Sequence, residues 1–356
     1  MKKPNEIEIV MEAIARKKPE SIPIALWTHV GALPFLGVDY EKSCKNGEAL
    51  AEVNLIFQKK FGLDLLKVTP YFRNICIGWG CKYKWTPGNE WVATVEYSVK
   101  KEEDWETLKI LDPPKTTLAE DIKAAKIIAR EIGDRIPFIW TIPGALFIAG
   151  ALAGDDLVLA GIRSNSDRLK KALDTITETE IKLGQMILEA GANGVFYTTR
   201  PGAQRDLWNH LTRAQVEEFS FKYDMRILES LRGADIRILH VCAGHKREDK
   251  PKLLVDMMKE EYFTRFPVNA INWWDRSYFD LSTAKRVYGN KFCLLGGLDQ
   301  ENTLPLGKPS DVQTEVRTAV DAAGPDGFIV GPGCTIRTST PEANFHAAVN
   351  AAHGIR

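Results

Sequence analysis

The feature that most constrains the fold is a regular alternation of short apolar runs with longer stretches of helical spacing. Eight such runs follow one another along the 356 residues, and amphipathic stretches separate most of them. Short apolar runs bounded by turn residues are typical of buried strands, and their alternation with helices indicates a parallel sheet. The runs are Ile22–Trp27, Asp64–Val68, Pro137–Ile142, Gly194–Thr198, Ile236–Cys242, Asn269–Trp274, Phe292–Leu295 and Gly327–Val330.

Closure of the sheet into a barrel is the economical arrangement, because a closed sheet leaves no unpaired edge strand. We therefore predict an α/β fold, a (β/α)8 TIM barrel that residues 1–356 form as a single domain. A doubly wound open sheet is the competing architecture, but no glycine-rich phosphate fingerprint follows the first apolar run. The same patterns predict helices near residues 5–17, 47–61, 117–132, 175–190 and 214–231.

Residues 71–103 depart from this rhythm. They mix aromatic residues such as Trp79 and Trp85 with glycine and lysine, and Trp91–Tyr97 alternates in polarity like an exposed strand. We expect a β-hairpin insertion here, lying over one end of the barrel.

Composition excludes several classes of protein. Lysine plus arginine and aspartate plus glutamate number 47 each, so no strong field favours a nucleic acid or a membrane surface as partner. No window of 18 uncharged apolar residues occurs, and the N-terminus lacks the apolar core of a signal peptide. We expect a cytoplasmic protein without membrane insertion. Its six scattered cysteines are expected to be reduced thiols, some of them open to metal binding.

In a parallel barrel the carboxyl ends of all strands meet at one face, where active sites are built. The polar residues that follow the predicted strands are therefore the candidates for chemistry. They are His29, Tyr71, Arg73, Thr198, Thr199, Arg200, His240, Cys242, Asp275, Arg276, Asp299, Gln300 and Cys334.

Three of these candidates are soft metal ligands. His240 and Cys242 are two residues apart, so their side chains lie on the same face of an extended strand. Cys334 follows the last strand in the turn Gly331–Thr335, where glycines leave a short side chain accessible. One histidine and two cysteines are typical of a catalytic zinc site with a fourth position open to substrate or water. The alternative is a buried cysteine beside a hydrogen-bonded histidine.

Three further residues are candidates for catalytic or supporting roles. Asp275 is a possible fourth ligand or a partner of a ligand, although it could equally cap the next helix or pair with Arg276. Asp299 lies at a glycine-rich strand end, where it could orient substrate or cap a helix. His29 follows the first strand and is a pocket candidate, with a satisfied structural histidine as the alternative.

Three segments resemble the uroporphyrinogen decarboxylase superfamily, namely Lys18–Trp27, Asn269–Gly297 and Gly331–Asn344. The likeness covers nearly the whole chain and implies a (β/α)8 barrel. The decarboxylases of this superfamily carry an arginine-rich motif after the first strand, which holds substrate carboxylates. Trp27–Pro34 stands in that place here and contains no arginine, which argues against porphyrinogen decarboxylation.

The other branch of the superfamily comprises corrinoid-dependent methyltransferases, whose signature is H-x-C with a later zinc-binding cysteine. His240, Cys242 and Cys334 match that signature. The resemblance implies Zn²⁺ as cofactor and methyl transfer between a corrinoid of the methylcobalamin type and a small-molecule thiol. It is equally compatible with transfer from a methylated donor, such as an aromatic methyl ether, to the corrinoid. No D-x-H-x-x-G carrier motif occurs, so a partner protein is expected to carry the corrinoid. A decarboxylase and a non-catalytic zinc-stabilised barrel are the alternatives.

Overall fold

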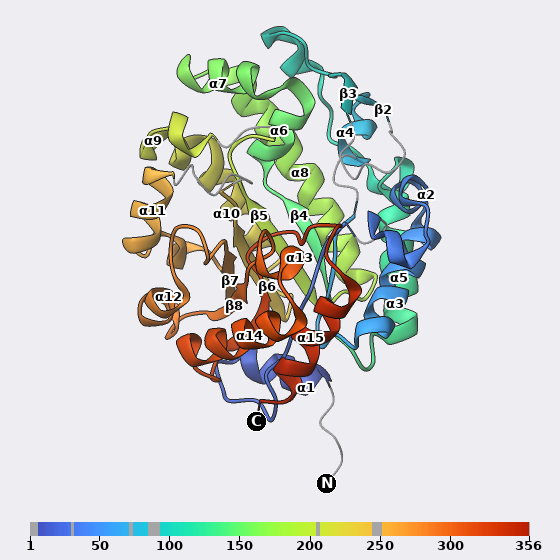
Figure 1. The fold of residues 1–356 in the computed structure, drawn as a ribbon. Helices are drawn as coiled ribbons and strands as arrows, with labels where there is room; N and C mark the ends of the chain where they lie inside the picture. The colour runs from blue at the N-terminus through green and yellow to red at the C-terminus, as the bar shows by residue number, and fades with distance from the viewer. Residues whose placement is uncertain are drawn as a thin grey trace.

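The computed structural model describes residues 6–29, 32–70, 74–84, 93–203, 207–243 and 251–355. At its centre a seven-stranded sheet has the order β1-β4-β5-β6-β7-β8-β9, with every neighbouring pair parallel (Figure 1). The predicted parallel α/β architecture is thereby confirmed. The strands are β1 (Leu66–Val68), β4 (Phe138–Pro143), β5 (Gly194–Thr199), β6 (Ile236–Val241), β7 (Ala270–Trp273), β8 (Cys293–Leu298) and β9 (Phe328–Pro332).

The first predicted strand, residues 22–27, differs from expectation because only Ile24 forms a bridge, to Val330 of β9. Backbone bonds nevertheless join this segment to both edges of the sheet, since Ala25 N donates to Val330 O at 2.9 Å and Asp64 N donates to Ile24 O at 3.2 Å. The pairing is short because Pro23 has no N–H and the Ile24 N–H donates to the Asp64 side chain. The segment therefore closes the sheet in place of a full eighth strand.

Helices cover the outside of the sheet (Figure 1). They are α1 (Glu6–Ile14), α2 (Tyr40–Lys45), α3 (Gly47–Phe61), α4 (Asn74–Gly78), α5 (Ala119–Ile132), α6 (Ala145–Ala153), α7 (Asp155–Arg163), α8 (Asp167–Glu189), α9 (Arg213–Val216), α10 (Lys222–Ser230), α11 (Lys252–Lys259), α12 (Leu281–Tyr288), α13 (Thr303–Leu306), α14 (Pro309–Ala323) and α15 (Glu342–His353). Short 3-10 turns lie at Pro34–Leu36, Glu102–Thr107, Pro113–Lys115, Trp208–His210 and Tyr262–Arg265.

The expected helix at 47–61 has the bounds of α3, and the one at 117–132 begins two residues later, as α5. The helix expected at 214–231 is α9 and α10 joined by a π-helical turn at Glu217–Phe221. The sequence pattern missed α6 because eight of its nine residues are buried, which leaves no polar face to reveal a helical period. No single helix in the described ranges is long and apolar enough to cross a membrane, although α6 and α7 pass that test together as a pair bent by 118°.

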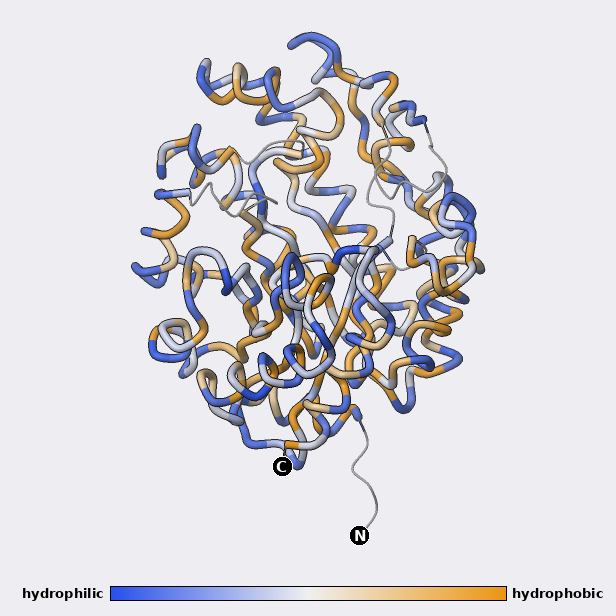
Figure 2. Tube along the Cα trace, in the orientation of Figure 1, coloured by the Kyte–Doolittle hydropathy of each residue, from blue (hydrophilic) through white to orange (hydrophobic). Residues whose placement is uncertain are grey.

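The inside of the sheet is filled by apolar side chains of β4 to β9 and by Leu65, which precedes β1. They include Leu65, Ile139, Phe196, Ile238 and Leu295, and Val10, Ala13 and Ile14 of α1 pack against the same cluster. Figure 2 shows hydrophobic positions running through the central strands, with hydrophilic ones mostly in the outer segments. Helix α1 lies beside the C-terminus, at the opposite end of the molecule from α7 (Figure 1). Helix α1 therefore covers one end of the apolar interior.

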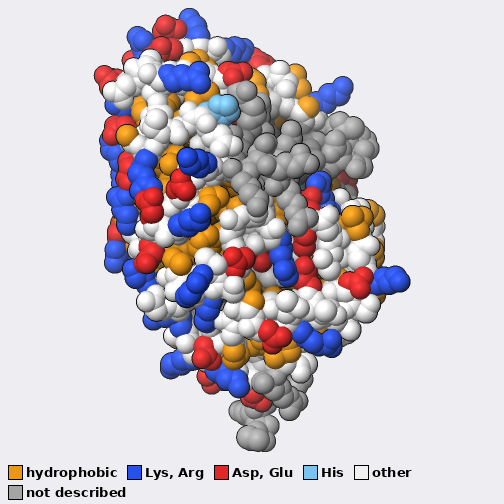
Figure 3. Space-filling view, turned by 60° about the vertical axis from the view of Figure 1, so that its left-hand side comes forward, with side chains coloured by type: hydrophobic (Ala, Val, Ile, Leu, Met, Phe, Trp, Pro, Cys, Tyr) orange, Lys and Arg blue, Asp and Glu red, His pale blue; other side chains and the backbone are white. Residues whose placement is uncertain are grey.

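The predicted hairpin insertion is present in its described part. β2 (Lys82–Lys84) pairs antiparallel with β3 (Ala93–Glu96), and both strands are partly or fully exposed. Lys82 Nζ and Glu96 Oε2 form an ion pair at 2.8 Å across the two strands. The candidates Tyr71 and Arg73 lie outside the described residues. Acidic and basic side chains are interspersed on the face drawn in Figure 3, as the equal totals of 47 suggest.

Candidate metal centre

His240 and Cys242 are positioned by β6 and its continuation. In the sheet register His240 lies beside Thr198 of β5 and Asn272 of β7. Strand β6 ends at Val241, but Cys242 N still donates to Thr199 O at 3.1 Å, so the pairing with β5 extends to this residue. Because the backbone stays extended, both side chains lie on the inner face of the sheet.

Cys334 is positioned by a close approach of the turn after β9. A Cβ added to Gly333 would lie 2.8 Å from Trp274 Cα and 3.0 Å from Trp273 O, so only glycine fits against the end of β7. The Gly333 N–H donates to Gln300 Oε1 at 3.1 Å. These two contacts fix the backbone from which the next residue reaches the inner face.

The three predicted ligands converge. One ligand atom from each of His240, Cys242 and Cys334 lies within 4.8 Å of the others, and Cys334 Sγ is 3.8 Å from His240 Nε2. Tetrahedral zinc with nitrogen and sulfur ligands holds these atoms ~3.6 to 3.8 Å apart, as bond lengths of ~2.0 to 2.3 Å require. The arrangement therefore fits a zinc ion once the ligand atoms move slightly closer together. It leaves a fourth ligand position open.

Asn272 fixes the tautomer of His240. Its Nδ2 donates to Leu295 O at 2.9 Å and to Pro332 O at 3.0 Å, which orients the amide. Its Oδ1 then faces His240 Nδ1 at 2.6 Å and can only accept, so Nδ1 carries the proton. The lone pair of Nε2 is consequently left for a metal, as in the histidine ligands of known zinc sites. Asn272 was not among the sequence candidates, and its register position beside His240 is what reveals this role.

The pKa values of the two cysteine thiols are shifted in opposite directions. A hydrogen bond with Cys334, aided by His240 and Arg200, holds the pKa of Cys242 well below its ordinary value, although burial opposes this. The same hydrogen bond, burial and the charge of Cys242 raise the pKa of Cys334. The pair is therefore prepared to lose its first proton from Cys242, and thiolates are the form that binds metals.

Two buried cations lie near this pair. Arg200 follows β5, is 9 % exposed and acts electrostatically on Cys242. Lys67 of β1 is 4 % exposed, and burial lowers the pKa of its ammonium to about 7 while Cys334 and Cys242 counteract the shift. Lys67 was not among the sequence candidates. A lysine inside the otherwise apolar run Leu65–Val68 was the signal that could have found it.

Asp275 is placed apart from the three ligands. Its Oδ1 would lie 3.2 Å from a Cβ added to Gly296, and its Oδ2 lies 3.7 Å from Arg276 Nε. It lines a cavity of about 200 Å³ with residues of α12 and α14, on the helix-covered side of β8. Burial raises the pKa of Asp275 to about 7, against the field of Arg276. Pairing with Arg276, one of the two expected alternatives, is thus present, and a role at the metal stays a prediction.

Asp299 and His29 also have local partners. Asp299 Oδ1 accepts from the backbone N–H groups of Glu301 and Asn302, at 2.9 and 3.1 Å, which is an Asx turn just before α13. The His29 ring packs edge-on against Tyr40, with ring centroids 6.3 Å apart. Neither residue belongs to the three-ligand group, and their roles toward substrate remain predictions.

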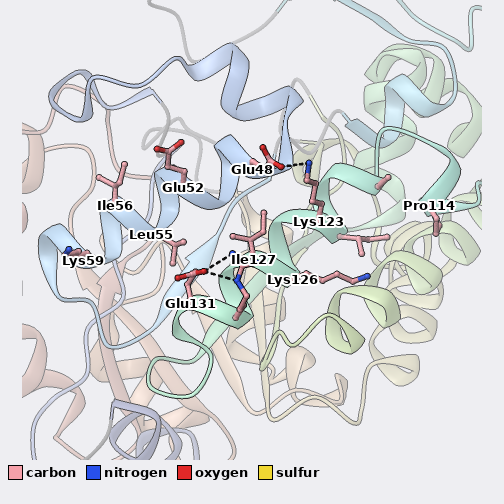
Figure 4. Close-up of a pocket in the computed structure, with 13 residues that line it drawn as sticks. Glu48, Glu52, Leu55, Ile56, Lys59, Pro114, Lys123, Lys126, Ile127 and Glu131 are labelled. Carbon is pink, nitrogen blue, oxygen red and sulfur yellow. Dashed lines mark hydrogen bonds and ion pairs between the residues drawn. The ribbon is translucent and has the colours of Figure 1, made fainter.

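A larger surface groove lies elsewhere. It measures about 960 Å³ and runs between α3 and α5, lined by apolar residues such as Leu55 and Ile127 and rimmed by Glu48, Lys123 and Glu131 (Figure 4). None of its lining residues belongs to the candidate metal centre.

The fold and site define a parallel α/β barrel with a histidine and two cysteines gathered at one end. The model of the uroporphyrinogen decarboxylase family matches residues 5–355, so the chain belongs to that family. It is 22% identical, over 98% of both chains, to a methylcobamide:CoM methyltransferase, MtbA, from Methanosarcina mazei. It is 24% identical to a uroporphyrinogen decarboxylase from Sodalis glossinidius, over 88% of this chain and 85% of the relative. Among solved structures, a methyltransferase from Methanosarcina mazei superposes with a TM-score of 0.83 at 18% identity, covering 98% of each chain.

Proposed function

We propose that the protein is a zinc-dependent methyltransferase that moves a methyl group between a corrinoid, carried by a separate protein, and a small-molecule thiol. The observation that carries this proposal is the convergence of His240, Cys242 and Cys334 within 4.8 Å. The likeness to methylcobamide:CoM methyltransferases, at 22% identity over almost the whole chain, supports the same reading.

In this proposal each residue has a defined task. His240 Nε2 and the two thiolates hold the metal, and Asn272 keeps the imidazole in the tautomer that can do so. A zinc ion bound there would supply the Lewis acidity that keeps a coordinated thiol deprotonated at neutral pH. The burial of His240 and Cys242 excludes water from the inner side of the site. Substrate then has to approach from the open end of the barrel, where a carrier protein would dock.

The reverse task is compatible with the same ligands. A methylated donor, such as an aromatic methyl ether, could occupy the fourth position and give its methyl group to the corrinoid. Which direction operates depends on the charged and polar groups around that position.

A decarboxylase acting on a porphyrinogen is the second candidate, favoured by the family model and by relatives such as the Sodalis glossinidius enzyme. Such chemistry needs cations to hold several substrate carboxylates, whereas the segment Trp27–Pro34 offers none. A non-catalytic zinc site would need a fourth protein ligand. Within the described residues, the group contains only three protein ligands.

Metal analysis combined with methyl exchange tests the proposal. Wild-type protein is expected to hold about one zinc ion per chain and to demethylate methylcobalamin in the presence of coenzyme M. Cys242→Ser and Cys334→Ser should lose both properties. Cys293→Ser is the matched control, because Cys293 is also buried inside the barrel but outside the ligand group, and burial raises its pKa to about 12.

Less than about half an equivalent of zinc in the wild type would refute the metal site. Zinc binding without methyl exchange, accompanied by loss of carboxyl groups from uroporphyrinogen, would favour the second candidate instead.

A further inference from the structure

The ammonium of Lys67 has an unusual environment for a lysine. Its Nζ donates to Thr69 Oγ1 at 2.9 Å and lies over the rings of Phe196 and Trp27, 4.4 and 5.4 Å from their centroids. In the described part of the chain no carboxylate forms an ion pair with it. A buried ammonium without an opposite charge costs free energy, so a lysine at this position calls for a negative partner.

A negatively charged partner for Lys67 would lie at the candidate metal centre. The groups that act electrostatically on Lys67 are the thiols of Cys334 and Cys242. A physical connection runs through Phe196, whose ring stacks on the imidazole of His240 with centroids 5.1 Å apart and planes at 26°. Ammonium, phenyl ring and imidazole are therefore in successive contact.

The formal charges show what this arrangement favours. Two thiolates balance Arg200 and the protonated form of Lys67, so a dication bound by neutral His240 would leave the centre with a surplus of positive charge. An anionic ligand in the fourth position reduces that surplus, whereas a neutral ether oxygen or amine leaves it unchanged. Burial strengthens the discrimination because buried charges are screened less than charges in water.

We propose that Lys67 is a positioning residue whose ammonium stabilises negative charge on a thiolate in the fourth ligand position, so that the site selects an anionic sulfur over a neutral ligand. This inference rests on the proposed zinc role. It assigns a thiol, and not a methyl ether, to this protein as the ligand of the fourth position. The charge that selects this ligand is the Lys67 ammonium, on the inner side of the site. The thiol proton leaves to solvent when the thiolate forms.

The test uses full-length protein loaded with Co²⁺, whose absorption reports both a new sulfur ligand and a new nitrogen ligand. The probes are 2-mercaptoethanol, which binds as its thiolate, and imidazole, which binds uncharged. Lys67→Met removes the charge at nearly constant volume, and Lys67→Arg keeps it. Lys285→Met is the control, because Lys285 is also a partly buried lysine but lies on α12 outside the barrel, donating to Asp326 O.

For Lys67→Met we expect about tenfold weaker binding of 2-mercaptoethanol, the loss of roughly one screened charge interaction, with imidazole binding within about twofold of wild type. Lys67→Arg and Lys285→Met should bind the thiol within about threefold of wild type. Cobalt stoichiometry should be unchanged in all variants, which verifies that each is folded.

Equal weakening of both probes, or no weakening of either, would overturn the inference, as would a tenfold loss in Lys67→Arg. A protein that binds no metal refutes both this inference and the proposed function. Lys67-dependent thiol binding without methyl exchange refutes only the methyl transfer.

Discussion

Replacement of Asn272 by alanine tests the link between the sheet and the ligand geometry. The side chain is fully buried, with three hydrogen bonds, to Leu295 O, Pro332 O and His240 Nδ1. Alanine leaves two carbonyls and one imidazole N–H with fewer partners in a buried position. At about 1 kcal/mol for each group, the free energy of unfolding should fall by about 3 kcal/mol.

The effect on the metal is a separate quantity. Without Asn272 the imidazole can rotate and exchange tautomers, so part of the binding free energy is spent on restoring the Nε2 lone pair. Loss of such an outer partner typically weakens metal binding by about 10- to 100-fold. We expect a reduction in this range when zinc affinity is measured by competition with a chromophoric chelator.

Asn344→Ala separates the two effects. Asn344 is equally buried, and its Nδ2 also donates to two backbone carbonyls, Leu304 O at 2.8 Å and Gly307 O at 2.9 Å. It contacts no candidate ligand in these bonds. We expect the Asn344→Ala variant to have a free energy of unfolding about 2 kcal/mol lower in urea experiments and to keep wild-type zinc affinity. Equal zinc affinities of the two variants would refute the role assigned to Asn272.

Two further predictions follow from contacts at Gly333 and Glu180. Gly333→Ala places a methyl group 2.8 Å from Trp274 Cα, so the free energy of unfolding in urea should fall by about 1–3 kcal/mol. Zinc binding, measured with the chelator, should weaken as well. Gly233→Ala is the control, because its methyl group meets no atom within 4 Å, and it should change neither quantity. Glu180 is buried without hydrogen-bond partners in the described structure, and burial together with Asp121 raises its pKa well above 4.5. Because the unfolded chain ionises this carboxyl from pH 4.5 upward and the folded chain resists ionisation, wild-type stability is lost as pH rises above that value. Glu180→Gln should therefore raise the free energy of unfolding by about 1–3 kcal/mol at pH 7.5 and much less at pH 5, and equal gains at both pH values would contradict this account.

The sequence was sufficient for the strands because each buried run is short, apolar and followed by a turn. It was misleading at Ile22–Trp27, where hydrophobicity is satisfied by burial but Pro23 and the Asp64 side chain prevent regular pairing. It was silent at α6, where burial on all sides removes the helical period. Pattern reasoning therefore finds where a segment is buried more reliably than which backbone bonds it makes.

The convergence of the three candidate metal ligands could be predicted because local rules place them. The two-residue spacing of His240 and Cys242 fixes a common face, and the glycines around Cys334 indicate a tight turn at a strand end. For Asp275 the strand-end rule left two alternatives open, a role at the metal and a local pairing. The chain bends after β7, and the carboxylate meets Arg276 and Gly296 on the helix-covered side. Only the three-dimensional path distinguishes the two sides of a strand end.

Lys67 and Asn272 were missed for a reason that suggests a better rule. Both lie two residues beyond a side chain of the apolar barrel interior, Leu65 and Ala270, and His240 stands in the same relation to Ile238. A period of two keeps each of them on the inner face, one layer closer to the open end of the barrel. The layer that follows the last apolar layer must meet substrate or solvent, so polar residues there are selected for the site and not for the core. A search of that layer across all strands would have identified Lys67 and Asn272 together with His240. The strand ends alone did not identify them.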